Sequence, residues 1–229
     1  DMKIDGKDVY PKLHDKLKES GFDKKEPISK QLYDIYGLYP APGDRHVGEF
    51  FPYYMKEEVL MEQDYEWKNN DFKVVDGWRE EARVLFDEVR TKKEGYEEFL
   101  KGSGETATYF IRSLATGDIS DEMVNVINNG YIDNVSSGII VELPTYIDEF
   151  GLHPQKIGKL PDAIAAQCDR LGREYLLMVE AAATCNYELA RQAMFLDPLV
   201  SNCKYPELLL KDLIRANLDL LPEAWEKHC

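Results

Sequence analysis

The sequence has no apolar run near the roughly 20 residues needed to cross a bilayer, and its first residues, 1–6, hold no hydrophobic signal-peptide core. Positive charge is also scarce, because 28 Lys and Arg residues stand against 43 Asp and Glu residues, leaving a net charge of -15. Such an acidic surface repels the phosphates of nucleic acids and anionic membranes. We therefore expect a cytoplasmic protein that binds neither nucleic acid nor membrane.

The sequence is also poor in cysteine and has no CxxC pair; its four cysteines are Cys168, Cys185, Cys203 and Cys229. The first two fall in helical patterns, which is typical of small buried thiols. We expect reduced thiols, with neither disulfides nor a zinc site. Three histidines have no partner at metal-ligand spacing and are interpreted as structural or solvated: His14, His153 and His228.

What the sequence does have is helical periodicity at both ends and alternation in between. A chain of 229 residues with 44% hydrophobic residues can fill a core. Apolar residues three and four apart predict helices over 10–20, 27–36, 78–89, 104–116, 161–182, 187–196 and 206–220. Alternating residues over 123–157 predict a sheet, including a strand 139–143 that Pro144 bounds. The fold class is therefore α+β, a mixed and largely antiparallel sheet packed by long helices.

Two segments need separate interpretation. The acidic stretch 56–75 is predicted to be a surface excursion with a possible strand near Phe72. Residues 102–107 spell GxGxxA, which in the right setting is a dinucleotide-phosphate loop. A charged helical segment precedes it instead of a buried strand. The sequence therefore favours a helix start, with Ser103 as N-cap and a buried face of Phe110, Ile111 and Leu114.

The stretch 36–54 is where the sequence points to chemistry. Three different ionisable side chains stand consecutively there, Asp44, Arg45 and His46, after helix-breaking Pro40, Pro42 and Gly43. A carboxylate beside a guanidinium stays ionised, and an imidazole can carry a proton near neutral pH. The trio could hold a polar substrate and move its protons. The alternative is an Asp N-cap on a short helix that Pro52 ends.

Several motifs together resemble glycoside hydrolase family 4, the NAD- and manganese-dependent glycosidases. They occur in the family's order and cover nearly the whole chain. They are Pro42-Gly43-Asp44-Arg45-His46, Glu49-Phe50-Phe51-Pro52, Ser103-Gly104-Glu105, Asn129-Gly130-Tyr131-Ile132-Asp133-Asn134, Val141-Glu142-Leu143-Pro144, Gly151-Leu152-His153-Pro154 and Ala193-Met194-Phe195-Leu196-Asp197-Pro198-Leu199. The bend at 42–46 resembles the branch that acts on alpha-linked, unphosphorylated sugars or uronic acids.

The resemblance implies an unusual hydrolysis that differs from the two-carboxylate scheme. In the family, NAD oxidises the sugar 3-hydroxyl, a base removes the acidified C2 proton, the glycosidic oxygen leaves, water adds and hydride returns. By motif position, Asp44 would be that base and the catalytic residue, and Arg45 and His46 would contact the substrate. The substrate would be a small-molecule glycoside, either a neutral hexose or a uronic acid.

The resemblance also implies that this chain is incomplete. The family's dinucleotide-binding domain, and the Cys and His that hold manganese, precede the region that corresponds to Asp1. We therefore expect residues 1–229 to form a C-terminal substrate-binding and oligomerisation domain of a homodimer or homotetramer. NAD and Mn²⁺ would belong to the complete enzyme, with no cofactor or metal on this chain, which alone would be inactive. The alternative is a non-catalytic carbohydrate-binding or scaffold domain.

Overall fold

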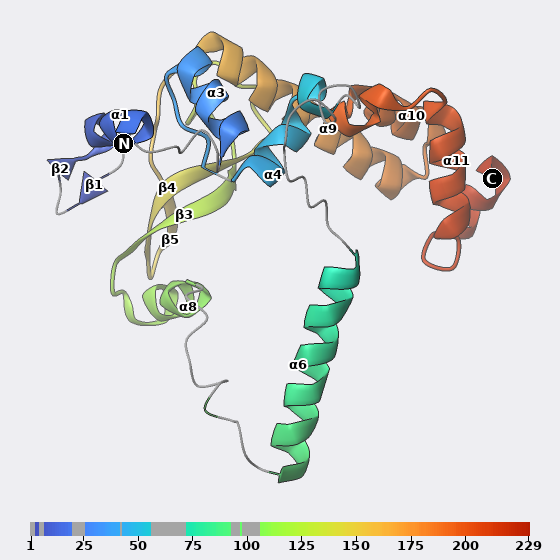
Figure 1. Cartoon of the computed structure of the whole chain (residues 1–229), viewed down its shortest axis with the longest axis horizontal. Coiled ribbons are helices and arrows are strands. Elements are labelled where there is room, and N and C mark those ends of the chain that lie inside the picture. The colour runs from blue at the N-terminus through green and yellow to red at the C-terminus, as the bar shows by residue number, and fades with distance from the viewer. Residues whose placement is uncertain are drawn as a thin grey trace. The chain divides into compact units, whose positions relative to one another are not determined.

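The structure, a computed structural model, describes residues 3–4, 7–19, 26–41, 43–55, 72–92, 97 and 106–229. The chain divides into two compact units, and Figure 1 labels their helices and strands. Unit 1 contains the described residues of 1–65, 127–140 and 157–229, and unit 2 contains those of 66–126 and 141–156. Each unit is described by itself.

Unit 1 is mainly helical. Its elements are the strands β1 (Lys3–Ile4) and β2 (Lys7–Asp8), the helices α1 (Tyr10–Glu19), α3 (Pro27–Tyr36), α4 (Asp44–Val47), α9 (Asp162–Thr184), α10 (Tyr187–Leu196) and α11 (Pro206–Ala216), and the 3₁₀ helices η1 (Gly48–Phe50), η2 (Pro52–Met55), η3 (Pro198–Asn202) and η4 (Glu223–His228). Helix α10 packs against α9 and α11. Leu210, Ile214 and Trp225 form a buried cluster at the C-terminal end.

Local sequence signals account for most helix ends in unit 1. Pro27 occupies the first turn of α3, and Gly37 ends that helix with a φ of 71°, a left-handed conformation that glycine adopts without strain. The Asn186 side chain accepts hydrogen bonds from the Glu188 and Leu189 amides and so caps α10. The predicted helix ranges 27–36 and 187–196 are confirmed.

Unit 2 contains the three-stranded sheet of the region 120–154. Its elements are α6 (Phe72–Lys92), α8 (Ala107–Thr116), β3 (Ser120–Ile127), β4 (Ile140–Asp148) and β5 (Gly151–Pro154), and the sheet order is β3-β4-β5. Strands β4 and β5 form an antiparallel hairpin in which Asp148 pairs with Gly151. Leu143 and Ile147 are buried on β4. The predicted α+β class, with antiparallel pairing of β4 and β5, is confirmed.

Two predicted boundaries in unit 2 are wrong. Strand β4 does not end at Pro144 but continues to Asp148. Proline lacks only its own backbone N–H donor. The Pro144 carbonyl oxygen still accepts a hydrogen bond from the Gln155 amide at 2.9 Å. Phe72 begins α6 and is not in a strand, while the predicted excursion over 56–71 lies outside the described residues.

One predicted buried face in unit 2, that of α8, is also wrong, although both predicted helices exist. On α6, the Trp78 side chain is exposed. On α8, Ile111 and Leu114 are exposed, and Ser113 is the buried residue, with its hydroxyl donating to Ser120. Periodicity finds an apolar stripe, but it does not say what covers that stripe. The predicted N-cap Ser103 and the GxGxxA residues 102–105 lie outside the described residues.

The cysteine and histidine predictions have clear outcomes. All four cysteines carry free thiols, as expected. His14 contacts the Tyr33 hydroxyl at 2.8 Å, His153 pairs with Asp148 at 2.9 Å, and His228 stacks on the Tyr187 ring. Each of the three therefore has a structural contact. Within the described ranges, no helix is long and apolar enough to cross a membrane.

Helix α9 approaches the chain before β4 unusually closely at Gly172. A Cβ placed at Gly172 would lie 2.5 Å from Cδ1 and 2.8 Å from Cβ of Ile139, a side chain that is 1% exposed. Gly172 therefore serves close packing inside unit 1. Gly77 in α6 has no atom within 4 Å of such a Cβ, so it provides a matched comparison.

We predict that Gly172→Ala lowers the free energy of unfolding by about 1–2 kcal/mol, because overpacking at Ile139 costs more than the roughly 1 kcal/mol that alanine gains in a helix. Gly77→Ala should be neutral or stabilise its helix by up to about 1 kcal/mol. Urea unfolding measures both. Equal effects of the two substitutions would contradict the close approach.

Glu174 is a buried acid in α9, with 3% of its surface exposed. Burial raises the pKa of its carboxyl, the nearby Asp197 acts in the same direction, and Arg170 acts in the opposite one. Its Oε2 has no hydrogen-bond partner among the described residues, and the Arg170 Nη1 lies 3.8 Å from it. An ionised Glu174 therefore opposes folding.

We predict that Glu174→Gln becomes more stable than the parent as the pH rises. A raised folded-state pKa gives stability below the unfolded-state value, about 4.3, and this stability is lost as the pH rises through the folded-state pKa. The difference in unfolding free energy should therefore be small at pH 4 and favour Gln at pH 8. Glu180→Gln, an exposed site on the same helix, is the control. A difference that does not vary with pH would disprove the assignment.

Candidate functional site

The bend predicted to carry chemistry lies in unit 1 between α3 and η2. Gly43 precedes α4 in an extended conformation, and the chain then continues through α4, η1 and η2. Proline and glycine before residue 44 keep α3 and α4 separate. Asp44 is the first residue of α4, so the three candidate residues begin a short helix.

The Asp44 carboxylate is held by the start of α3. Its Oδ2 accepts a hydrogen bond from the Ile28 amide and its Oδ1 accepts one from the Ser29 amide, both at 2.7 Å. Because Pro27 has no N–H, these amides are the first free donors of the helix. The alternative, in which Asp44 is the N-cap of a short helix that Pro52 ends, is wrong: Gly43 is the N-cap of α4, α4 ends at Val47, and the Asp44 carboxylate instead accepts from the first amides of α3.

This arrangement fixes the orientation of Asp44 and leaves it half-buried. The two amides hold both carboxyl oxygens at the positive end of the α3 dipole. A carboxylate has about four lone-pair positions, so each oxygen keeps capacity for a further bond. The group can therefore accept a proton from a ligand while it is anchored.

Two residues near Asp44 were missed by sequence reasoning. The Glu26 carboxylate accepts a hydrogen bond from the Asp44 amide at 2.7 Å. Burial raises the pKa of Tyr39, with the Glu26 and Asp44 carboxylates acting in the same direction and the Ser29 side chain opposing them. Tyr39 thus lies within the field of both acids. A helix that begins at Pro27 needs a hydrogen-bond acceptor for its first amides. The sequence alone does not show which residue supplies that acceptor.

Arg45 and His46, the other two candidate residues, differ in whether the structure describes their side chains. The Arg45 side chain lies outside the described part of the structure. The His46 side chain is exposed, and among the described residues it makes no hydrogen bond. The structure therefore brings Asp44 together with Glu26 and Tyr39, and leaves the His46 imidazole available to a ligand.

Aromatic side chains pack behind the bend. The Phe51 ring lies 6.2 Å from that of Tyr36 and 6.3 Å from that of Tyr54, measured between centroids. Tyr54 is buried, and its hydroxyl donates to Gln31 Oε1 at 2.6 Å. These contacts join η2 to α3 on the side of the bend that follows Asp44.

Arg170 of α9 fastens the end of the bend to the distant helices. Its guanidinium donates to the carbonyl oxygens of Phe50 at 3.1 Å and Leu196 at 2.8 Å, and to Gln167 Oε1 at 3.2 Å. Because all three hydrogen bonds start from one planar guanidinium, they link the end of the bend rigidly to α9 and α10. The bend is thus held by α3 at its beginning and by α9 at its end.

Within the described ranges, no cluster of three or more His, Cys, Asp or Glu side chains is arranged to hold a metal ion. The strands β3, β4 and β5 also follow one another with no helix between them, unlike a dinucleotide-binding βαβ unit. The described residues therefore fit neither Mn²⁺ nor NAD, and the expectation that both belong to other parts of the polypeptide stays a prediction.

Comparison with known proteins agrees with the motifs. Residues 1–200 match the family 4 glycosyl hydrolase C-terminal domain. An alpha-galactosidase of Bacillus subtilis (strain 168) is 29% identical over 237 residues, covering 97% of this chain and 52% of that protein. An alpha-galacturonidase of Thermoanaerobacterium saccharolyticum is 30% identical, covering 95% of this chain and 50% of that protein.

Solved structures share the fold. A 6-phospho-alpha-glucosidase from gut microorganisms, in complex with NAD and glucose-6-phosphate, has a TM-score of 0.77 and 24% identity, covering 96% of this chain and 51% of that one. A 6-phospho-beta glucosidase from Thermotoga maritima, with manganese, NAD⁺ and glucose-6-phosphate, has a TM-score of 0.72 and 23% identity, covering 95% and 50%. The chain spans about half the length of these relatives. The chain therefore belongs to the family 4 glycosyl hydrolases, and the region that it matches is their C-terminal domain.

Proposed function

We propose that this chain is the substrate-side portion of a glycosidase that hydrolyses an alpha-linked glycoside of a neutral hexose or a uronic acid. The observation that carries the proposal is the family match over residues 1–200. Relatives named as an alpha-galactosidase and an alpha-galacturonidase, which align with almost all of the chain, support that substrate class.

Asp44 is the proposed catalytic base. A carboxylate removes a carbon-bound proton efficiently only when a neighbouring carbonyl has made that proton acidic. The amides of Ile28 and Ser29 hold the Asp44 carboxylate in one orientation, which suits removal of an already acidified C2 proton. The proton would move to a free lone pair of the carboxylate, and the electron pair left on C2 would expel the glycosidic oxygen.

Arg45 and His46 are the proposed substrate contacts. Their support is their position directly after Asp44 at the start of α4, together with the exposure of His46. A guanidinium can bind a sugar carboxylate through two parallel hydrogen bonds, so Arg45 would favour a uronic acid. An imidazole can donate to or accept from a sugar hydroxyl.

The remaining proposals concern the complete protein. NAD and Mn²⁺ would be held by an N-terminal domain outside this chain, and residues 1–229 would serve substrate binding and oligomerisation. Solved relatives whose titles name NAD and manganese support the cofactor assignment. A cytoplasmic address of the complete protein is likewise a proposal.

A second candidate is a non-catalytic carbohydrate-binding or scaffold domain. The observation that favours it is the structural use of Asp44, because both carboxylate oxygens cap α3. A side chain that serves only as a cap needs no chemistry. The two candidate functions therefore predict different effects on turnover when the Asp44 charge is removed.

We predict that Asp44→Asn lowers kcat of the full-length polypeptide, assayed with NAD and Mn²⁺ on an aryl alpha-galactoside or galacturonide, by about 100-fold or more. Asparagine keeps one acceptor oxygen for α3 but has no basic carboxylate. The control is Asp8→Asn, because Asp8 also accepts a hydrogen bond from a helix-start amide, that of Tyr10. Its turnover should match the parent.

Unchanged turnover of a folded Asp44→Asn variant would remove Asp44 from the mechanism. If the parent protein binds sugar but does not turn over any of these glycosides, the scaffold reading is correct. Circular dichroism of both variants separates loss of chemistry from loss of the α3 cap.

For the proposed homodimer or homotetramer, the exposed apolar residues Leu176 and Val179 of α9 are the suggested contact, with Val179 66% exposed. We predict that Val179→Lys shifts the full-length protein toward monomer in light scattering after size exclusion, because a buried, unpaired charge is costly. Thr184→Lys is the control, because it adds the same charge at an exposed position on another face of the helix. A parent protein that is already monomeric would contradict the proposal.

A further inference from the structure

A cavity of about 250 Å³ lies within unit 1 between α9, α10, α11 and η4. Its walls are mostly apolar, formed by Met178, Ala181, Ala182, Ala190, Ala193, Met194, Leu210, Leu213 and Trp225. At about 30 Å³ for each water-sized group, the space holds about eight such groups. The size fits a small organic molecule.

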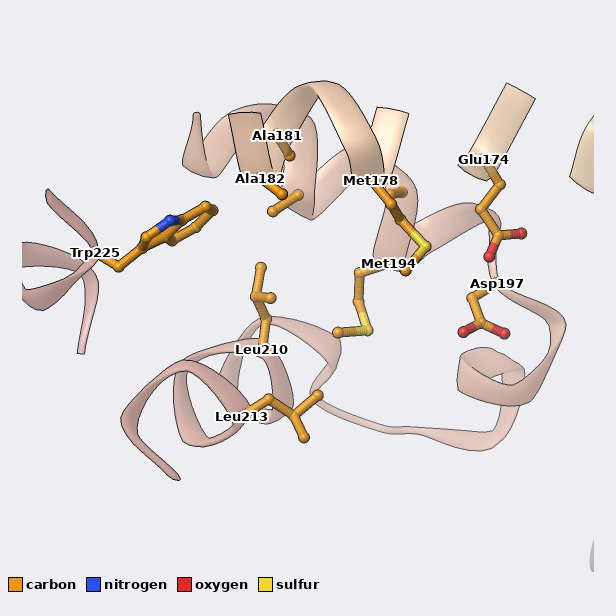
Figure 2. A pocket seen from close by; sticks show the side chains of 11 residues that line it. Glu174, Met178, Ala181, Ala182, Met194, Asp197, Leu210, Leu213 and Trp225 are labelled. Atoms are coloured by element: carbon orange, nitrogen blue, oxygen red, sulfur yellow. The ribbon is translucent and has the colours of Figure 1, made fainter. Parts of the chain in front are cut away.

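Two carboxyl groups occupy one end of this cavity. Figure 2 shows Glu174 and Asp197 near one another beside Met178 and Met194, with Trp225 at the opposite end. Glu174 is 3% exposed, and its Oε2 has no hydrogen-bond partner among the described residues. Buried polar atoms in folded proteins are normally paired, so the unpaired oxygen marks a position where a donor belongs.

Arg170 does not fill that role. It lies 3.8 Å from Glu174 Oε2, beyond hydrogen-bond distance. Its guanidinium is already committed to the carbonyls of Phe50 and Leu196 and to Gln167. Its Nη1 and Nη2 donors are thus directed to the bend, to the end of α10 and along α9, and none of these bonds goes to the cavity carboxyls.

The side chains that line the cavity indicate which class of ligand it binds. Two neighbouring acids repel an anion and favour a cation with several N–H donors. Ca²⁺ and Mg²⁺ take about six oxygen ligands and Zn²⁺ about four nitrogen or sulfur ligands, and the described residues contain no suitable cluster of acids, histidines or cysteines. Apolar walls of this extent favour a hydrocarbon body. The class of ligand that fits both the acids and the apolar walls is therefore an ammonium ion that carries a short apolar chain.

We propose that this cavity binds a small amphipathic ammonium ion, with the charged group at Glu174 and Asp197 and the hydrocarbon chain along the Met and Ala walls toward Trp225. The site is separate from the Asp44 bend and does not depend on the proposed glycosidase activity. The buried acid supplies the recognition, and the apolar walls supply the contact area.

The test uses n-hexylammonium chloride as the probe. The full chain, labelled with ¹⁵N at its tryptophan indoles, is titrated, and the Trp225 signal is assigned with Trp225→Phe. Saturable movement of that signal is expected, with 1-hexanol binding at least tenfold more weakly because it lacks the charge. Glu174→Gln should weaken n-hexylammonium binding at least tenfold, while Glu180→Gln should leave it unchanged.

Ala182→Phe provides a second variant that fills the cavity without altering either acid, and it should abolish binding of both probes. Equal affinity for n-hexylammonium and 1-hexanol would overturn the proposal by showing an apolar cavity without charge recognition. Absence of saturable binding in the parent, or an unchanged affinity in Glu174→Gln, would also overturn it.

Discussion

The two hydrogen bonds from the Ile28 and Ser29 amides to the Asp44 carboxylate are the interaction on which the candidate site depends. Pro27 leaves these amides as the first free donors of α3, and Asp44 satisfies them from a bend that starts after Pro40. One side chain therefore completes a helix and fixes its own orientation. An anchored carboxylate loses little freedom when a substrate arrives, which is the advantage of preorganisation in catalysis.

The other end of the bend depends on α9. Arg170 joins the Phe50 carbonyl to the end of α10, and Gly172, two residues later, allows α9 to lie against Ile139. The same helix carries Glu174, whose buried carboxyl has a raised pKa and lies beside the apolar cavity. Helix α9 thus combines, within one short stretch, close packing, fixation of the bend and a buried acid whose Oε2 has no hydrogen-bond partner among the described residues. Such an acid costs stability, and it is retained where a ligand or a partner can pair with it.

Much of the fold could be predicted from local signals. Pro27, Gly37 and Asn186 mark helix ends through backbone constraints that act within a few residues, and all three were found. The continuation of β4 through Pro144 was missed because only the hairpin partner shows that its lost donor is harmless. The capping of α3 by Asp44 was missed for a similar reason: the contact spans 16 residues, and no periodicity encodes it. The motif order located the bend, but Glu26, Tyr39 and Arg170 appear around it only in three dimensions.

The central claim is that Asp44 removes the proton from C2 of a sugar activated elsewhere in the polypeptide. Deuterium incorporation at C2 tests it most directly, with the full-length protein turning over its glycoside in D₂O in the presence of NAD and Mn²⁺. The account predicts a product deuterated at C2 for the parent protein and no C2 exchange for a folded Asp44→Asn variant. A parent product that keeps its C2 proton, or a variant that exchanges it at the parent rate, would contradict the account.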